Sequence, residues 1–177
     1  NIIMDHLEAI VEIKNVVEPS FSKKIMDLTN HKAGCNLAIT NTVDTAVRNV
    51  KGYHLNLNTP TNMFYWNYIK KEIERLYIFY KVKFPMINNL LKYSVGGKYE
   101  VHTDYHTNSP RSLSVIINLN NDYEGGDLIF TDQGKQEVKK IELTEKSIVF
   151  FPSNFMYPHS IEPITKGTRY SIVAWLQ

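Results

Sequence analysis

The pattern of apolar residues divides the chain near residue 85. Before that point, apolar positions follow helical spacing in two segments. The β-branched run 10–17 predicts a strand, and Pro19 after it can open a first helix. A second helix is predicted from residues 59–60, where Thr and Pro are typical of an N-cap and a first helical position. The residues expected on its buried face are Trp66, Ile69, Ile73, Leu76 and Tyr80.

After residue 85 the chain reads as eight short strands. The runs are rich in Val, Ile, Phe and Tyr, and Gly, Asn, Asp or Pro separate them. The predicted strands cover residues 87–95, 99–104, 112–119, 127–131, 136–141, 147–151, 159–162 and 169–176. Short strands at regular spacing favour a barrel or sandwich. We therefore predict one mainly β domain over residues 1–177, with helical and strand support at 1–84 and a barrel core at 85–177.

Composition excludes several classes of function. The 20 Lys and Arg nearly balance the 18 Asp and Glu, and a formal charge of +2 gives little attraction for nucleic acid or an anionic membrane. The single cysteine, Cys35, excludes an intrachain disulfide framework and a multi-cysteine zinc site. The chain has no signal-peptide layout and no apolar run near the roughly 18 residues that span a bilayer. We expect a soluble cytoplasmic protein, and the Asn- and Lys-rich composition suggests a bacterial or phage origin.

His102 and Asp104 can bind one metal ion together. Side chains alternate along a strand, so residues two apart point to the same face. A second imidazole, His159, begins another predicted strand. Two imidazoles and one carboxylate are the set that holds non-haem Fe(II) and leaves coordination positions open. The three residues therefore predict an iron site, and His106 is expected at its rim rather than as a fourth ligand.

The last predicted strand carries a candidate carboxylate site. Its odd positions 169–175 hold Arg, Ser, Val and Trp, whereas the even positions are apolar enough to face the helices. A buried guanidinium does not shed its proton and needs a partner. Because the arginine fork binds carboxylates bidentately, Arg169 with Ser171 is predicted to hold the distal carboxylate of 2-oxoglutarate.

Several motifs occur in a fixed order from residue 93 to the end of the chain. The segment 93–105 has a tyrosine, glycines, a second tyrosine and then His-x-Asp. Downstream follow Arg111, Glu124–Asp127, Phe130, Phe151–Ser153, His159, Gly167–Ser171 and Trp175. This ordered set resembles the prolyl 4-hydroxylase-like family of 2-oxoglutarate/Fe(II) dioxygenases, over roughly residues 85–177.

The resemblance implies a fold and a role for each matched residue. The implied fold is α+β, mainly β: a double-stranded β-helix (jelly-roll) barrel with supporting N-terminal helices. The implied Fe(II) ligands, which are also the catalytic residues, are His102, Asp104 and His159. The implied co-substrate residues are Arg169, Tyr93, Ser171 and Asn118, and the implied substrate-side residues are Arg111 and Trp175.

Two positions depart from relatives of this family. Many collagen-type relatives use lysine where this chain has Arg169. Oxygen-sensing relatives carry a tyrosine that contacts 2-oxoglutarate near Asn118, so that contact is rebuilt or absent here. Tyr99 lies three residues before His102, and strand parity predicts that it points away from the metal and is structural.

The implied reaction is hydroxylation of an unactivated C–H bond. Its co-substrates are 2-oxoglutarate and O2, its products include succinate and CO2, and ascorbate is an expected reductant. Halogenating relatives lack the carboxylate ligand, so Asp104 favours hydroxylation. A nucleic-acid demethylase is disfavoured because that branch has a second arginine where this chain has Trp175.

The expected substrate is a prolyl residue in a protein or peptide. Two alternatives remain: hydroxylation of a free amino acid or small metabolite, and a non-catalytic barrel that only binds its ligand. The sequence also leaves open whether the polar stretch 30–58 covers the site as a substrate lid.

Overall fold

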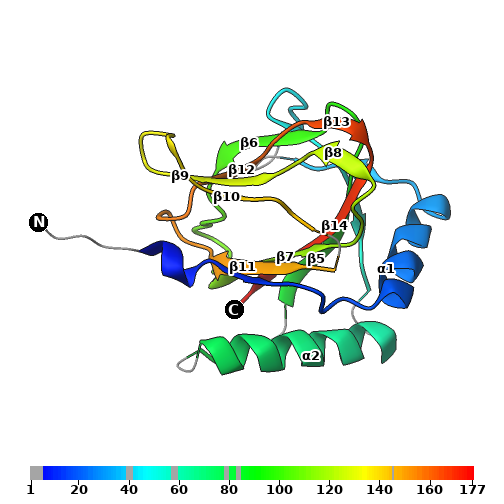
Figure 1. Ribbon diagram of the computed structural model, residues 1–177, viewed down its shortest axis with the longest axis horizontal. Helices are drawn as coiled ribbons and strands as arrows, with labels where there is room; N and C mark the ends of the chain where they lie inside the picture. The colour runs from blue at the N-terminus through cyan, green and yellow to red at the C-terminus, as the bar shows by residue number, and fades with distance from the viewer. Residues whose placement is uncertain (1–5, 39–41, 57–59, 78–79, 83–84, 145) are drawn as a thin grey trace, which may run out of the picture.

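Two antiparallel sheets face each other, and two helices lie against the outer side of the larger one (Figure 1). The computed structural model describes residues 6–38, 42–56, 60–77, 80–82, 85–144 and 146–177. The helices are α1 (Pro19–Met26) and α2 (Pro60–Leu76), with short 3₁₀ helices η1 (His6–Ala9) and η2 (Asp27–Asn30). Among the described residues, no helix is long and apolar enough to cross a membrane.

The strands are divided between two main sheets and a small ladder. The larger sheet has the order β1 (Val11–Ile13), β11 (Ile148–Pro152), β7 (Leu113–Asn118), β14 (Arg169–Leu176), β5 (Pro85–Tyr93), β4 (Lys51–His54) and β2 (Cys35–Asn36). The smaller sheet has the order β10 (Glu137–Ile141), β9 (Leu128–Thr131), β12 (His159–Ile161), β6 (Lys98–His102) and β3 (Arg48–Asn49). Strands β8 (Tyr123–Gly125) and β13 (Ile164–Gly167) form the ladder. This is the predicted double-stranded β-helix.

Apolar side chains form two clusters on opposite faces of the larger sheet. Strand β14 contributes to both. The cluster beneath the helices takes Ile172, Ala174 and Leu176 from it, and the cluster between the sheets takes Val173 and Trp175. Full burial of one such side chain stabilises the fold by roughly 1.5–3 kcal/mol. The predicted alternation of the last strand is therefore confirmed, and it leaves the inner face of β14 to line the space between the sheets.

All eight strands predicted after residue 85 are present, with ends within two residues of the expected ones. Strands β8 and β13 were not predicted. They are short, and each is defined by pairing with the other across 40 residues or so of intervening chain, for which the local sequence has no signal.

The first half of the chain departs further from the prediction. The run 10–17 forms only the short β1, because Asn15 has a φ of 59° and breaks the extended backbone. The described parts of 30–58 contain β2, β3 and β4, which extend both main sheets, so this stretch is not simply a polar loop.

The stripe predicted for the second helix is correct at Trp66, Ile69 and Ile73, which are buried. It is wrong at Leu76, which is 39% exposed at the end of α2. Tyr80 lies beyond the helix, although it still packs against the same cluster. The N-cap expected at residue 59 lies outside the described residues.

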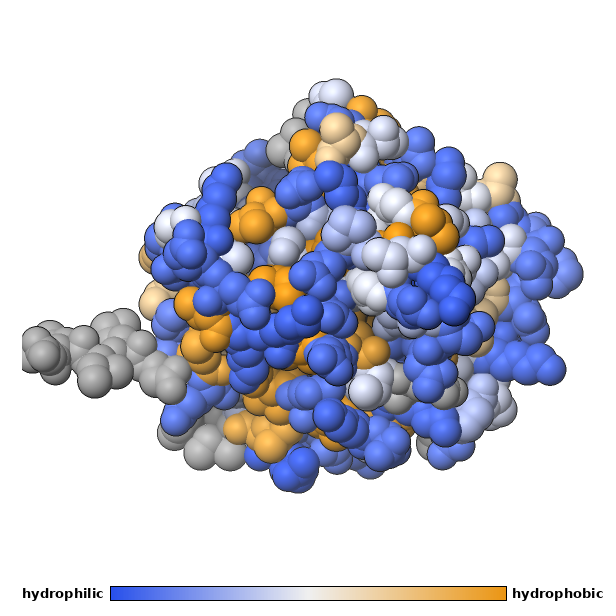
Figure 2. All heavy atoms as spheres, turned by 45° about the horizontal axis from the view of Figure 1, so that its top comes forward, coloured by the Kyte–Doolittle hydropathy of each residue, from blue (hydrophilic) through white to orange (hydrophobic). Residues whose placement is uncertain are grey.

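The face shown in Figure 2 is mostly hydrophilic, with apolar residues in scattered patches. Large apolar side chains that are well exposed include Val43, Val95, Tyr105 and Phe155, which belong to four separate connections. Scattered exposed apolar residues are normal on a folded protein. The site is therefore sought in the interior, between the two sheets.

Candidate functional site

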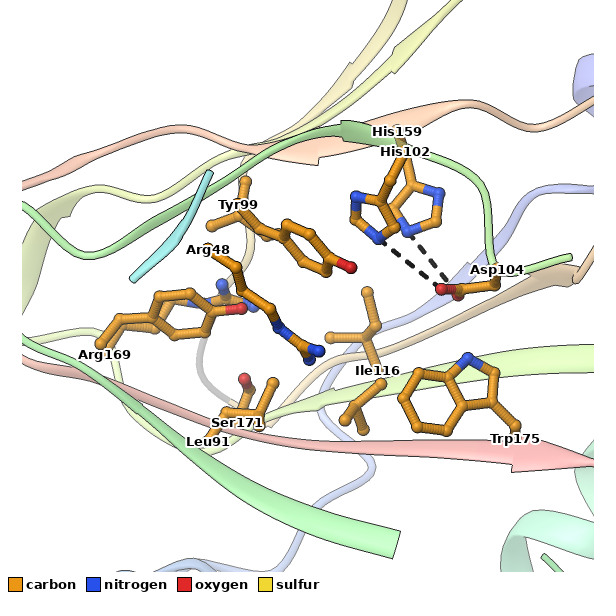
Figure 3. A pocket seen from close by; sticks show the side chains of 13 residues that line it. Arg48, Leu91, Tyr99, His102, Asp104, Ile116, His159, Arg169, Ser171 and Trp175 are labelled. Atoms are coloured by element: carbon orange, nitrogen blue, oxygen red, sulfur yellow. Dashed lines mark ion pairs between the residues drawn. The ribbon is translucent and has the colours of Figure 1, made fainter. Parts of the chain in front are cut away.

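A pocket lies between the inner faces of the two sheets (Figure 3). Its wall takes residues from β5, β7 and β14 of the larger sheet and from β3, β6 and β12 of the smaller one. Of the nine residues predicted for the site, seven line this pocket: Tyr93, His102, Asp104, His159, Arg169, Ser171 and Trp175. The remaining two, Arg111 and Asn118, lie beside it.

The three predicted metal ligands converge at one end of the pocket. His102 and His159 are direct partners across β6 and β12. Their Nε2 atoms lie 3.6 Å and 3.7 Å from the two carboxylate oxygens of Asp104, as the dashed lines in Figure 3 mark. The three ligand atoms lie within 4.8 Å of one another. One small divalent cation between them can therefore contact all three.

Backbone carbonyls fix the orientation of both imidazoles. His102 Nδ1 is 2.8 Å from the Glu100 carbonyl oxygen, and His159 Nδ1 is 3.0 Å from that of Tyr157. A carbonyl only accepts hydrogen bonds, so each Nδ1 must carry the proton that it donates. In a neutral imidazole the Nε2 is then the unprotonated nitrogen, and here it faces the metal position.

Asp104 is held as an ionised, oriented carboxylate. It is 7% exposed, and Ser114 donates a hydrogen bond of 2.6 Å to its Oδ2. Burial raises the pKa of Asp104, but the neighbouring imidazoles and the Ser114 hydroxyl outweigh that cost and hold the pKa well below its usual range. Ser153 lies 2.7 Å from the Ser114 hydroxyl and completes the support.

His159 is neutral at physiological pH. Burial, followed by the electrostatic influence of the neighbouring His102, lowers the pKa of His159 from 6.5 to about 4. A neutral imidazole is the form that coordinates a metal. His102 and His159 come from paired strands, and Asp104 lies just beyond the end of β6. This donor set of two imidazoles and one carboxylate therefore fits Fe(II).

The other end of the pocket is built around Arg169. This side chain is 1% exposed, and its Nε donates a hydrogen bond of 3.2 Å to Asn118 Oδ1. Its Nη1 and the Oγ of Ser171 are buried atoms without a hydrogen-bond partner among the described residues. Unpaired buried donors are costly, so this end lacks an acceptor. A carboxylate of 2-oxoglutarate would supply it.

Tyr93 adds a hydroxyl to this end. It is the direct partner of Arg169 across β5 and β14, and the guanidinium carbon lies 5.1 Å from its ring centroid. Burial raises the pKa of Tyr93, so the phenol stays protonated and can donate to a carboxylate. The donors at this end therefore fit the distal carboxylate of 2-oxoglutarate.

Asn118 supports Arg169 and does not line the pocket. Its Oδ1 accepts a hydrogen bond from Arg169, and its amide nitrogen lies within hydrogen-bond distance of the carbonyls of Asn120, Leu143 and Thr144. The amide of Asn118 is therefore engaged by Arg169 and by the surrounding loops. In this arrangement Asn118 does not make the predicted direct contact with 2-oxoglutarate.

Arg111 and Trp175 form a pair beside the metal end. The guanidinium carbon of Arg111 lies 4.0 Å from a ring centroid of Trp175, and its Nη1 is 3.4 Å from the Asp104 carbonyl oxygen. The indole nitrogen is buried, and none of the residues that the structure describes offers it a hydrogen bond. The structure therefore places both residues near the metal position, and their contact with substrate stays a prediction.

The predicted orientation of Tyr99 was wrong. Its ring stacks on His102, with centroids 3.5 Å apart and planes 16° apart, and it lines the pocket. The register between β6 and β12 shifts between these two residues, so strict alternation fails. Sequence parity could not show this irregularity.

Two further residues were missed. Ser114 orients Asp104, and Arg48 points into the pocket from β3. Arg48 lies in the polar stretch before α2, where nothing local distinguishes it from a solvated arginine. His106 is exposed and is not part of the ligand group, as expected.

Comparison with known sequences points to one family. The family model described as the 2OG-Fe(II) oxygenase superfamily matches residues 88–177. A PKHD-type hydroxylase of Gloeothece citriformis is 34% identical over 99 residues, which are 51% of this chain and 43% of that protein. One of Prochlorococcus marinus is 37% identical over 90 residues, 49% of this chain and 39% of that protein. The chain thus spans less than half the length of these relatives.

Solved structures share the fold. A Trichoplax adhaerens prolyl hydroxylase, in complex with a peptide fragment of the hypoxia inducible factor oxygen degradation domain, has a TM-score of 0.77 at 19% identity, covering 95% of this chain and 83% of that one. A Pseudomonas putida prolyl-4-hydroxylase has a TM-score of 0.76 at 15% identity, covering 96% and 92%. At these identities the likeness shows the fold alone.

Proposed function

Because the chain belongs to the 2OG-Fe(II) oxygenase superfamily, we propose that it is a 2-oxoglutarate- and Fe(II)-dependent dioxygenase that hydroxylates an unactivated C–H bond. One observation carries this proposal. Two imidazoles and a carboxylate converge at one end of a buried pocket, and a buried guanidinium with a free donor lies at the other. A metal-chelating dicarboxylate is the ligand class that joins two such ends.

Each end has a separate task. His102, Asp104 and His159 would hold Fe(II), whereas Arg169, Ser171 and Tyr93 would hold the distal carboxylate. When bound, Fe(II) and 2-oxoglutarate supply the oxidising chemistry: one oxygen atom of O2 goes into succinate with loss of CO2, and the other goes into the C–H bond.

The protein's own contribution is orientation and exclusion of water. The carbonyls of Glu100 and Tyr157 hold the two Nε2 atoms toward the metal, and Ser114 holds the carboxylate. Apolar side chains such as Ile116 and Val173 line the space between the two ends. A dry wall of this kind limits side reactions of the oxidising centre with water.

The proposed substrate is a prolyl residue in a protein or peptide. The names of the relatives and the fold of the prolyl hydroxylases support it. Arg111 and Trp175, which lie beside the metal position, are the proposed substrate contacts. Ascorbate as reductant and a cytoplasmic location remain predictions.

Anaerobic titration of Fe(II) and then 2-oxoglutarate tests the cofactor proposal. The wild type should develop the charge-transfer absorption of a ferrous 2-oxoglutarate complex, and Asp104→Ala should not. The control is Asp27→Ala, an exposed aspartate in η2, which should behave as wild type. A wild type without this absorption would contradict the proposal.

The substrate class is tested next with oxygen and ascorbate. Prolyl peptides should gain one oxygen atom and yield succinate, whereas a gain by free amino acids would favour the small-molecule alternative. A protein that binds Fe(II) and 2-oxoglutarate but yields no succinate with either pool would be a binding module.

A further inference from the structure

Arg48 is a second guanidinium in the pocket, and the proposed chemistry leaves it without a task. It comes from β3, the edge strand of the smaller sheet, and Figure 3 shows its head between Tyr99 and Ser171, pointing into the space between the sheets. Arg169 enters the same pocket from the opposite sheet. Two cations therefore face one buried space.

Contacts within the protein hold Arg48 there. It is the direct partner of Tyr99 across β3 and β6, and its guanidinium carbon lies 4.4 Å from the Tyr99 ring centroid. Its Nη1 donates a hydrogen bond of 3.2 Å to the Ala38 carbonyl oxygen. Since Tyr99 also stacks on His102, the guanidinium is fixed in relation to the metal end.

These contacts do not satisfy the charge. Arg48 is 8% exposed, its Nε has no hydrogen-bond partner, and no ion pair among the described residues includes it. A buried charge without a counter-charge is strongly unfavourable, and arginine cannot escape by losing its proton. The cost persists in the free protein and is removed when an anion binds.

Charge balance shows that 2-oxoglutarate does not remove it. Fe(II), Asp104 and Arg169 together carry two positive charges, which the two carboxylates of 2-oxoglutarate neutralise. Among the buried charges, Arg48 then remains as one uncompensated positive charge, whereas the nearby Arg111 is only partly buried and keeps contact with solvent. On the basis of the proposed dioxygenase function, we propose that Arg48 is a second carboxylate-binding residue of this pocket. Charge balance assigns its carboxylate to the organic substrate, where an acidic side chain or the C-terminus of a prolyl peptide, or a free amino acid, can supply it.

The pocket is small, and Arg48 occupies part of its wall. With Arg48 in place, the free space measures about 30 Å³, room for a water molecule or two. A five-carbon dicarboxylate or an amino acid needs more space. A ligand that enters must therefore displace side chains of the pocket wall, and Arg48 is one of them.

The first experiment measures 2-oxoglutarate affinity from the charge-transfer absorption of the anaerobic Fe(II) protein. The variants are Arg48→Gln, Arg48→Lys and the control Arg75→Gln, which makes the same change on an exposed arginine of α2. Unchanged affinity in Arg48→Gln is expected if the substrate carries the carboxylate. A loss of about tenfold or more would assign the carboxylate to 2-oxoglutarate instead. Tighter binding would mean that Arg48 only fills the space, and would overturn the proposal.

The second experiment uses the same protein loaded with Fe(II) and 2-oxoglutarate. Perturbation of its absorption is titrated with the common amino acids and with their amides, which differ only in the carboxylate. The wild type should prefer at least one acid over its amide, and Arg48→Gln should lose about tenfold to a hundredfold of that preference. Arg48→Lys should keep part of it.

The outcomes separate the two proposals. If the wild type gives no absorption at all, the proposed function fails. If it does, but Arg48→Gln matches Arg75→Gln in 2-oxoglutarate affinity and no acid-over-amide preference depends on Arg48, the carboxylate proposal fails alone. A merely structural Arg48 would weaken acid and amide equally.

Discussion

The metal end and the carboxylate end of the pocket treat their polar groups in opposite ways. At the metal end, both imidazole Nδ1 atoms and the Asp104 carboxylate have partners within the protein. At the other end, Arg169 Nη1, Ser171 Oγ and Arg48 Nε are buried and have no hydrogen-bond partner in the part of the chain that the structure describes. The three metal ligands lack only a cation, whereas the second end needs an acceptor from outside.

This difference determines how the polar groups at each end affect the stability of the folded protein. Hydrogen bonds that orient the metal ligands also stabilise the fold, so the metal end is pre-organised at little cost. Unpaired guanidinium donors do the reverse, because they oppose folding until a ligand arrives. The two ends should therefore respond differently to substitution, pH and ligand.

Removal of a metal ligand should have the largest effect. In His159→Ala, Fe(II) affinity should fall more than a hundredfold, because only two of the three ligands remain. Loss of a residue that merely orients a ligand already costs about tenfold to a hundredfold. Anaerobic Fe(II) titration measures this. The exposed His106→Ala is the matched control and should bind as wild type. Equal affinity in the two variants would remove His159 from the site.

Loss of the cation at the other end should separate ligand binding from stability. Arg169→Leu should bind 2-oxoglutarate about a hundredfold more weakly, because the charge-assisted donors are lost. Fe(II) affinity should change little. The ligand-free variant should unfold at the same or a higher denaturant concentration, since an unpaired buried charge is gone. Strong destabilisation without ligand would show that Arg169 is already satisfied in the folded chain.

The metal end should make stability pH-dependent. The folded pKa of His159 is about 4 against 6.5 for a free histidine, because of burial and His102. Between these values the unfolded chain binds a proton that the folded chain excludes, so the free energy of unfolding rises with pH. From pH 7 to pH 5 the metal-free protein should lose about 2 kcal/mol.

Denaturant unfolding at the two pH values measures this loss. In His159→Gln the dependence should flatten, because glutamine does not titrate. An equal loss in the variant and the wild type would place the titrating group elsewhere.

The smallest effect is expected from Ser114, which supports Asp104 without touching the metal. Ser114→Ala should lower Fe(II) affinity about tenfold, because the carboxylate loses the hydrogen bond that orients it. Ser160→Ala, on the other face of β12 from His159, is the control. An Fe(II) affinity equal to wild type would mean that the rigid backbone alone positions Asp104.

Local sequence predicted most of the metal end. Two local signals were available: the spacing of His102 and Asp104, and the turn residues around the strands. Neither signal depends on where a strand lies in its sheet. The alternation of β14 was predictable for the same reason, because each face of that strand meets a different environment. Tyr99 was predicted to point the wrong way because the register shift depends on pairing with β12.

The sequence by itself determined which chemistry is present: the ligand types, their order and the arginine opposite them. Tertiary structure decided which polar groups meet. Pairing of β3 with β6 brings Arg48 beside Tyr99, and pairing of β14 with β7 makes Asn118 a support for Arg169. Such contacts join residues about fifty positions apart. They depend on the order of the strands in each sheet and on which acceptors the fold brings near each buried donor. The local pattern of apolar and polar residues encodes neither.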